Sequence, residues 1–220
     1  MSTRENSHKA AESDKITLVL GGTGKTGRRV AERLKARGVP TRIASRSGTP
    51  AFDWNEKGTW DGVLDGVRAA YISYAPDLAI PGATDAIRAF VARAVEHGVE
   101  RLVLLSGRGE EEAQHCERIV QDAGVEWTVV RASWFNQNFS EGEFLGMVHD
   151  GAITLPVADI PEPFVDVNDI ADVAVAALTE EGHDGEIYEV TGPRMLTFAQ
   201  VAKEISRAAG REVKFIQIPN

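Results

Sequence analysis

The sequence has a single cysteine and no long hydrophobic run. Cys116 stands alone among 220 residues, which excludes a disulfide framework and a cysteine-based metal site. No apolar stretch approaches the roughly 20 residues needed to cross a bilayer, and the polar N-terminus lacks the apolar core of a signal peptide. We expect a cytoplasmic protein that binds no metal and has no membrane partner.

The chain also lacks an excess of positive charge. Its formal net charge of −9 argues against nonspecific binding to nucleic acid or to an anionic membrane. Hydrophobic residues make up 43% of the chain, which is typical of a globular protein with a sizeable core. Residues 1–14 show no apolar periodicity and are predicted to be a disordered tail. Residues 15–220 are predicted to form one domain, as a monomer or homodimer, with 134–165 and 186–220 contributing a substrate-side lobe.

The most informative stretch is residues 16–30, ITLVLGGTGKTGRRV. β-Forming residues lead into the spacing Gly21-x-x-Gly24-x-x-Gly27, and a helix-forming segment follows at once. Gly21 suits a tight turn, Gly24 lets the backbone approach a diphosphate, and Gly27 lets the helix pack closely on the strand. Backbone N–H groups and the positive end of the helix dipole both favour an anion. The stretch therefore predicts a diphosphate site, which also includes Thr23, Lys25 and Thr26.

Two other interpretations share these residues. Gly24-Lys25-Thr26 looks like the end of a P-loop, but that motif requires a glycine five positions before Gly24, where the chain has Val19. The P-loop is therefore excluded. A glycine-rich turn that binds no ligand is the remaining alternative.

The rest of the chain alternates β-forming and helical segments at short intervals. Strands are predicted at 39–45, 51–54, 69–74, 101–105, 127–130, 153–156, 186–190 and 213–218. Helices are predicted at 59–64, 84–97, 110–123, 141–149, 169–178 and from Thr197 onward. This order predicts an α/β fold, a Rossmann-like doubly wound parallel sheet with helices on both faces. Ligands of such sheets bind at the carboxyl edge, where the glycine turn would lie.

Six segments occur in a characteristic order after residue 14. They are 18–30 (LVLGGTGKTGRRV), 44–47 (ASRS), 101–107 (RLVLLSG), 127–139 (WTVVRASWFNQNF), 163–178 (PFVDVNDIADVAVAAL) and 188–205 (YEVTGPRMLTFAQVAKEI). Together they resemble the NmrA-like group of atypical short-chain dehydrogenase/reductases. The resemblance implies NAD(P) binding, and the group includes quinone reductases, triphenylmethane-dye reductases and redox-sensing regulators. Its members usually continue for several tens of residues beyond the position of Pro219.

The residues after the second predicted strand indicate the type of cofactor. A carboxylate there would accept hydrogen bonds from a ribose 2′-OH and select NAD, whereas arginine favours a 2′-phosphate. The chain has Ser45-Arg46-Ser47 and no carboxylate before Asp53. Arg46 suits a forked contact with a phosphate, and Ser47 can donate a hydrogen bond to it. NADP(H) is therefore the expected cofactor and NAD(H) the alternative, while a solvated loop charge is the alternative role for Arg46.

Three further segments are assigned to the cofactor by their places in the predicted fold. Asp53-Trp54 resembles the family's contact with the adenine, and a capping or solvated Asp53 is the alternative. Tyr74-Ala75-Pro76 follows a predicted strand beside the glycine turn, where the family's backbone runs along the cofactor. Ser106-Gly107 ends the next strand, where the nicotinamide ribose is expected.

The chain has no Tyr-x-x-x-Lys pair, which acts as acid and base in typical dehydrogenases of this superfamily. The corresponding positions fall near Gly109 and Ala113, and neither side chain can exchange a proton. Alcohol–ketone chemistry and nucleotide-sugar epimerisation are therefore disfavoured. What remains is hydride transfer to an acceptor that needs little acid catalysis from the protein. His115 is the candidate catalytic proton donor, and a surface or packing histidine is the alternative.

The stretch after the sixth predicted strand resembles the family's segment on the substrate side of the nicotinamide. It begins at Arg131 and includes Trp134, Phe135 and Asn138. The two aromatic side chains would stack on a flat acceptor, or alternatively they cover the edge of the sheet. We therefore predict an NAD(P)H-dependent reductase of small quinone-like or aromatic substrates. The rival is a noncatalytic NADP-binding redox sensor, which the missing Tyr/Lys pair favours.

Overall fold

A computed structural model of the chain describes residues 16–157 and 159–219, and the tail predicted at 1–14 lies outside this part. The described residues divide into two compact units. The first unit holds residues 16–131 and 168–189, and the second holds residues 132–167 and 190–219. The predicted lobe was expected to resume at Glu186, whereas the second unit resumes at Val190.

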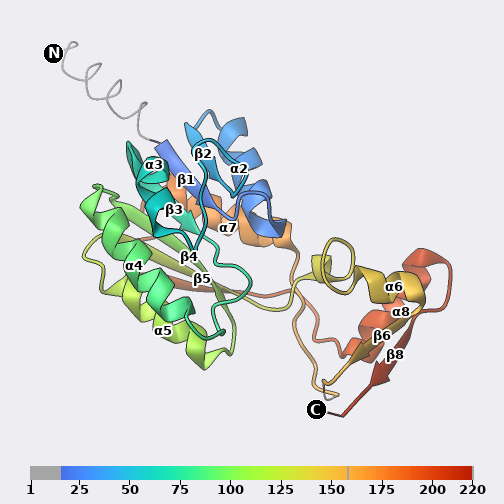
Figure 1. Cartoon of the computed structure of the whole chain (residues 1–220). Coiled ribbons are helices and arrows are strands. Elements are labelled where there is room, and N and C mark those ends of the chain that lie inside the picture. Colours follow the sequence, from blue (N-terminus) through green and yellow to red (C-terminus); the bar gives the residue numbers. More distant parts are fainter. Residues whose placement is uncertain (1–15, 158, 220) are drawn as a thin grey trace. The chain divides into compact units, whose positions relative to one another are not determined.

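The first unit is built on a six-stranded sheet (Figure 1) with the strand order β2-β1-β3-β4-β5-β7. The strands are β1 (Ile16–Leu20), β2 (Thr41–Ala44), β3 (Val67–Ile72), β4 (Arg101–Gly107), β5 (Glu126–Ala132) and β7 (Glu186–Val190). β1 pairs in parallel with β2 and with β3, and β3 pairs in parallel with β4. The strand order reverses between β1 and β3, because β2 lies on one side of β1 and the later strands lie on the other. The predicted doubly wound parallel sheet is confirmed.

Helices cover both faces of this sheet, as the alternating pattern predicted (Figure 1). The helices α3 (Trp60–Leu64), α4 (Ala83–Glu96) and α5 (Glu111–Gln121) lie on one face. The helices α2 (Lys25–Ala36) and α7 (Val167–Thr179) pack together, since Arg29 Nε donates a hydrogen bond to Asn168 Oδ1 at 3.2 Å and Arg33 contacts Asp172. Leu18 and Val19 point to opposite faces of the sheet and are both fully buried.

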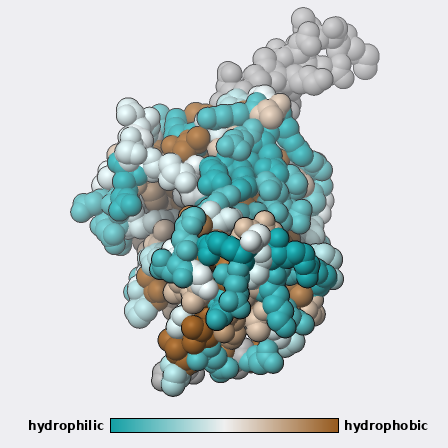
Figure 2. Space-filling model, turned by 90° about the vertical axis from the view of Figure 1, so that its right-hand side faces the viewer, coloured by the Kyte–Doolittle hydropathy of each residue, from teal (hydrophilic) through white to brown (hydrophobic). Residues whose placement is uncertain are grey.

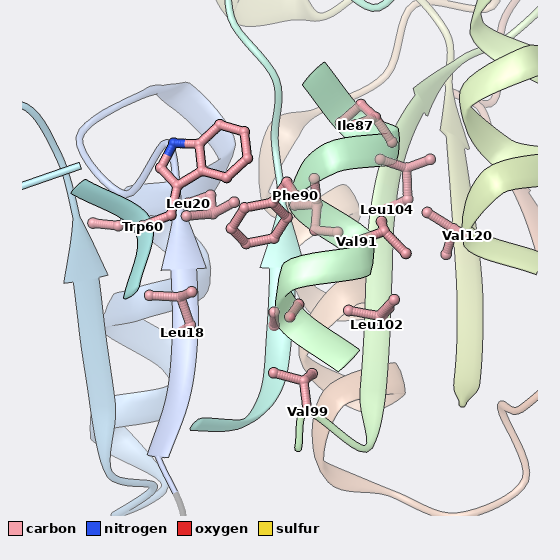
Figure 3. Packing of buried hydrophobic residues seen from close by; sticks show 14 of the residues in the cluster. Leu18, Leu20, Trp60, Ile87, Phe90, Val91, Val99, Leu102, Leu104 and Val120 are labelled. Carbon is pink, nitrogen blue, oxygen red and sulfur yellow. The ribbon is translucent and has the colours of Figure 1, made fainter. Parts of the chain in front are cut away.

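The hydrophobic core on the α4 side joins the sheet to three helices (Figure 3). Leucines of β1 and β4 meet side chains of α4, among them Phe90, which is fully buried. Trp60 of α3 is 2% exposed and its ring lies 5.7 Å from that of Phe90. The helical spacing predicted for 84–97 therefore reflects a real buried stripe, and α4 begins and ends within one residue of that prediction.

The strand predicted at 51–54 is wrong. Residues 51–53 have no regular secondary structure, and Trp54 lies in a turn. The Phe52 N–H donates to Ser45 O at 2.9 Å, and its ring lies 5.9 Å from Phe90 and 6.2 Å from Trp60. Phe52 packs against two helices. Its apolar side chain therefore serves this packing and does not indicate a strand.

The second unit is smaller and contains the two-stranded parallel sheet of β6 (Ala152–Leu155) and β8 (Lys214–Gln217). Its helices are α6 (Leu145–Asp150) and α8 (Phe198–Ala209), with a short 3-10 turn at Asn136–Asn138. Helix α8 begins with a capping box, because Thr197 Oγ1 accepts from Gln200 N and Gln200 Oε1 accepts from Thr197 N. Aromatic side chains dominate its core: Phe139, Phe144, Phe164 and Phe198.

A buried ion pair joins α5 to β5 in the first unit. The Glu117 side chain is 1% exposed and accepts three charged hydrogen bonds from Arg131, Nε to Oε1 at 2.9 Å, Nε to Oε2 at 3.1 Å and Nη2 to Oε2 at 2.6 Å. Ser106 Oγ at the end of β4 donates to the same carboxylate at 2.6 Å. Arg131 is 22% exposed, and its Nη1 lies 3.7 Å from Glu189 Oε1. Glu117 is therefore fully compensated inside the protein, whereas Arg131 also reaches the surface.

The surface is consistent with the acidic composition of the chain. In the view of Figure 2, hydrophilic residues cover most of the face, and hydrophobic residues form small separate patches. Within the described residues, no helix is both long enough and apolar enough to cross a membrane.

The asymmetry of the Glu117–Arg131 pair gives a stability prediction. Arg131→Met would leave a carboxylate buried without its cation, and we expect the free energy of unfolding to fall by about 3–5 kcal/mol. Glu117→Gln should cost less, because Arg131 keeps its contact with water and the neighbouring Glu189. Urea denaturation of the two variants measures the difference. A larger loss for Glu117→Gln would contradict the assignment of the buried partner.

Candidate active site

The glycine turn brings helix α2 into close contact with the end of strand β1. Gly21 has φ of +64°, a conformation that side chains other than glycine rarely adopt. A Cβ at Gly27 would overlap Gly21 O and lie 2.7 Å from Gly21 C, so only glycine fits there. A Cβ at Gly24 would meet only Gly21 O, at 3.2 Å, which leaves its outer side open. The environments of Gly21 and Gly27 match the roles that the spacing predicted for turn and helix packing, and the open side of Gly24 leaves room for the predicted ligand.

The N-terminus of α2 is free to bind an anion. Its cap residue is Gly24, no side chain caps it, and its first turn has no acidic residue. Thr23 and Gly24 are exposed and Lys25 is half-buried. Thr26 is 4% exposed, so its side chain faces inward and a ligand would meet only its backbone N–H. A helix start of this kind favours a phosphate through its N–H groups and its dipole.

The turn lies at the point where the strand order reverses. A Cβ at Gly21 would touch Ser73, 3.2 Å from its Cβ, so the loops after β1 and β3 are adjacent. In open parallel sheets the crevice at such a reversal is where ligands bind, at the carboxyl ends of the strands. The geometry of these residues therefore fits the diphosphate of a dinucleotide.

Arg46 and Ser47 lie in the turn that follows β2 and both are exposed. Ser45 O accepts hydrogen bonds from Gly48 N at 3.1 Å and Phe52 N at 2.9 Å, which holds the turn in place. Arg46 has no acidic partner among the residues that the structure describes. An unpaired guanidinium beside the strand that neighbours the glycine turn can bind a ribose phosphate.

Asp53, Trp54 and Tyr74 lie near one another on the α4 side of the sheet. Asp53 Oδ1 accepts a hydrogen bond from Asn55 N at 2.9 Å, which is the local turn that its capping alternative described. The Trp54 ring lies 4.9 Å from the Tyr74 ring. Both rings are half-buried, and Ala75 and Pro76 are exposed after them. The structure thus brings together three of the residues that were predicted to bind the cofactor.

Ser106 and Gly107 end β4, at the same edge of the sheet. Ser106 is 4% exposed, and its hydroxyl proton is directed to Glu117. Its remaining lone pairs can only accept hydrogen bonds from a ligand hydroxyl. The next acidic residue, Glu110, folds back onto this strand end: a Cβ at Gly107 would overlap the Glu110 carboxylate.

His115 does not lie with Ser106 and Glu117. It is exposed on α5, in a groove between α4 and α5 that also contains Arg88, Arg118 and Asp122. Glu117 and Cys116, on the inward face of the same helix, are buried. This placement is the surface position that its alternative interpretation described, and it does not support proton transfer by His115 at the edge of the sheet.

The predicted substrate residues belong to the second unit. Trp134 is 39% exposed, and its ring stacks on Phe144 at 6.0 Å and meets Phe198 edge-on at 5.4 Å. Phe135 is half-buried and pairs through its backbone with Val165, and Asn138 ends the short 3-10 turn. The Trp134 ring is therefore held by other aromatic rings with part of its surface open.

Two residues of the site edge were missed by sequence reasoning. Glu117 is a polar residue at a buried helical position, and the apolar residues Ala113, Cys116 and Val120 around it were the only signal. Glu110 directly follows Gly109, near which the tyrosine of the Tyr-x-x-x-Lys pair was expected, but its sequence neighbours do not distinguish it from a surface acid. Among the described residues, no group of three potential metal ligands occurs.

Comparison with known proteins shows the family to which the chain belongs. The model of the NmrA-like family matches residues 111–220, half of the chain. The agroclavine dehydrogenase of Claviceps fusiformis is 31% identical over 219 residues, covering 91% of this chain and 76% of that protein. The NAD(P)H azoreductase of Xenophilus azovorans is 30% identical over 232 residues, covering 92% and 77%.

Among solved structures, the NADPH-dependent quinone oxidoreductase of Escherichia coli superposes with a TM-score of 0.72. The superposition covers 92% of this chain and 78% of that one at 21% identity, so it shows a shared fold. Together with the two sequence relatives, the family model decides the assignment: this chain belongs to the NmrA-like family.

Proposed function

We propose that this protein is an NAD(P)H-dependent reductase that transfers hydride to a quinone-like or other flat aromatic acceptor. The observation that carries the proposal is the uncapped start of α2 at Gly24, beside Gly21 and Ser73 at the reversal of strand order. When bound there, the reduced nicotinamide supplies the hydride. The names of the two sequence relatives, a dehydrogenase and an NAD(P)H azoreductase, support an oxidoreductase role.

Arg46 supports NADP(H) as the cofactor. It is exposed after β2, without an acidic partner in the described part of the chain, and the turn holds no carboxylate that would accept from a ribose 2′-OH. Its fork of N–H donors suits the 2′-phosphate. NAD(H) is the alternative cofactor.

Ser106 supports the position of the nicotinamide ribose. Because the Ser106 hydroxyl donates its hydrogen bond to Glu117, Ser106 presents only acceptor lone pairs at the edge of the sheet. A ribose hydroxyl can donate to these lone pairs. The Glu117–Arg131 pair then holds the Ser106 hydroxyl in a single orientation, which contributes to orienting the ring that carries the hydride.

The aromatic residues of the second unit support a flat aromatic acceptor. The Trp134 ring is braced by Phe144 and Phe198 and keeps 39% of its surface exposed. A rigid, partly open ring can stack on a flat aromatic molecule. An acceptor of this class stabilises the anion that follows hydride transfer, which agrees with the absence of a Tyr-x-x-x-Lys pair from the sequence. That absence equally favours the rival function, a noncatalytic NADP-binding redox sensor.

Steady-state turnover distinguishes the two functions. We expect NADPH oxidation, followed by the loss of absorbance at 340 nm, with at least one member of a panel of quinones, azo dyes and triphenylmethane dyes. Trp134→Ala should raise the KM for that acceptor, because the stacking surface is lost. Tight NADPH binding without turnover on any acceptor would favour the sensor.

Arg46→Ala tests the choice of cofactor. Loss of a charged hydrogen bond of about 1.5–3 kcal/mol should raise the Kd for NADPH about 10- to 100-fold. The Kd for NADH should stay the same, since NADH has no 2′-phosphate. Isothermal titration calorimetry measures both values, and Arg88→Ala is a matched control at an exposed arginine of α4. An unchanged Kd for NADPH would contradict the role of Arg46.

A further inference from the structure

The reduction of an acceptor needs a proton as well as a hydride, and the usual donors of the superfamily are absent. The positions equivalent to the tyrosine and lysine fall near Gly109 and Ala113. Ser106 already donates its proton to Glu117 at 2.6 Å. His115 lies in the groove between α4 and α5, and Tyr74 follows β3, not β4. Neither Ser106 nor His115 is therefore placed to deliver a proton at the end of β4.

Glu110 is the remaining protonatable group at this strand end. It precedes α5, and its carboxylate lies against Gly107, where even a methyl group would overlap it. In the described part of the chain the Glu110 carboxylate has no hydrogen bond or ion pair, although the residue is half-buried. Gly107 is adjacent to Ser106, so the Glu110 carboxyl lies at the same strand end as the proposed ribose contact.

We propose that Glu110 is the general acid that protonates the acceptor after hydride transfer. This inference rests on the proposed reductase function. The acceptor gains a hydride from the reduced nicotinamide nucleotide, which is thereby oxidised, and the resulting anion takes the proton from the Glu110 carboxyl. The O–H bond of Glu110 breaks and the proton binds to the acceptor oxygen or nitrogen. Solvent water then returns a proton to the carboxylate, which its half-exposed position allows.

The surroundings of Glu110 favour its protonated form. Burial raises the pKa of Glu110 above its usual range, and the nearby carboxylates of Asp77 and Glu112 raise it further. Asp77 lies on the loop after β3, and Glu112 lies in the first turn of α5. The neighbouring cation, Arg108, is paired with Glu189 at 3.3 Å. A carboxyl with a raised pKa is closer to the operating pH and is therefore a more effective acid.

The comparison of two acceptors tests this role. An azo acceptor gives a localised nitrogen anion that must be protonated, whereas the anion of a reduced benzoquinone is delocalised and stable. Glu110→Gln should lower kcat for the azo acceptor about 100-fold and leave kcat for the quinone within about twofold. Glu111→Gln, at the exposed first residue of α5, is the matched control and should leave both unchanged. Equal losses on both acceptors, or no loss on either, would overturn the role of Glu110.

Asp77→Asn provides a second test through pH. The acid form of Glu110 is lost as the pH rises through its pKa, so kcat for the azo acceptor should fall along a limb with that pKa. Removing the Asp77 charge lowers the pKa of Glu110 and should move this limb to lower pH. Carbon-13 NMR of the glutamate carboxyls, without cofactor or acceptor, should show the same shift in the signal that Glu110→Gln removes. An unmoved limb and an unmoved signal would contradict the proposal.

The two proposals fail in different ways. Wild-type protein that binds NADPH and reduces no acceptor would overturn the reductase function, and the role of Glu110 with it. Wild-type protein that reduces both acceptors, with Glu110→Gln equally active on both, would overturn only the role of Glu110.

Discussion

The close approach of Gly27 to Gly21 is the constraint on which the proposed site depends. No Cβ fits between the start of α2 and the end of β1, so the helix begins directly against the strand. This contact places the free N–H groups of α2 at the edge of the sheet where the strand order reverses. An anion at that edge meets both the dipole of the helix and the loop after β3. The diphosphate position therefore follows from backbone packing more than from any charged side chain.

The other half of the edge is organised by a buried charge. Glu117 lies on the inward face of α5 and is compensated by Arg131 of β5 and by Ser106 of β4. The pair therefore joins two adjacent strands and a helix, and at the same time it fixes what Ser106 can do. A hydroxyl whose proton is engaged can orient a ligand but cannot protonate it. The structure thus separates orientation, at Ser106, from proton delivery, which we assign to Glu110.

Sequence patterns predicted the regular elements better than the irregular ones. The buried stripe of α4 and the capping box of α8 carry local signals, namely helical apolar spacing and paired Thr197 and Gln200 side chains. The segment at 51–54 misled the prediction, because Phe52 is buried by the rings of Trp60 in α3 and Phe90 in α4 and not by strand pairing. His115 likewise has a side chain that can donate a proton, but it lies on the exposed face of α5. A step of one residue along a helix is enough to change the face on which a side chain lies.

By itself, the sequence determined the parallel α/β fold, the glycine turn with its three distinct glycines, the family, and the absence of a Tyr/Lys pair. These features are local, or they depend on the order of elements along the chain. Only the tertiary structure decided that Ser106 and Arg131 both donate to the Glu117 carboxylate. It also decided that the Glu110 carboxylate lies unpaired against Gly107. The contacts of Glu117 join side chains from two strands and a helix, and the contact of Glu110 depends on how its side chain folds back. Their chemistry depends on distances and burial, which the spacing of residues along the chain does not specify.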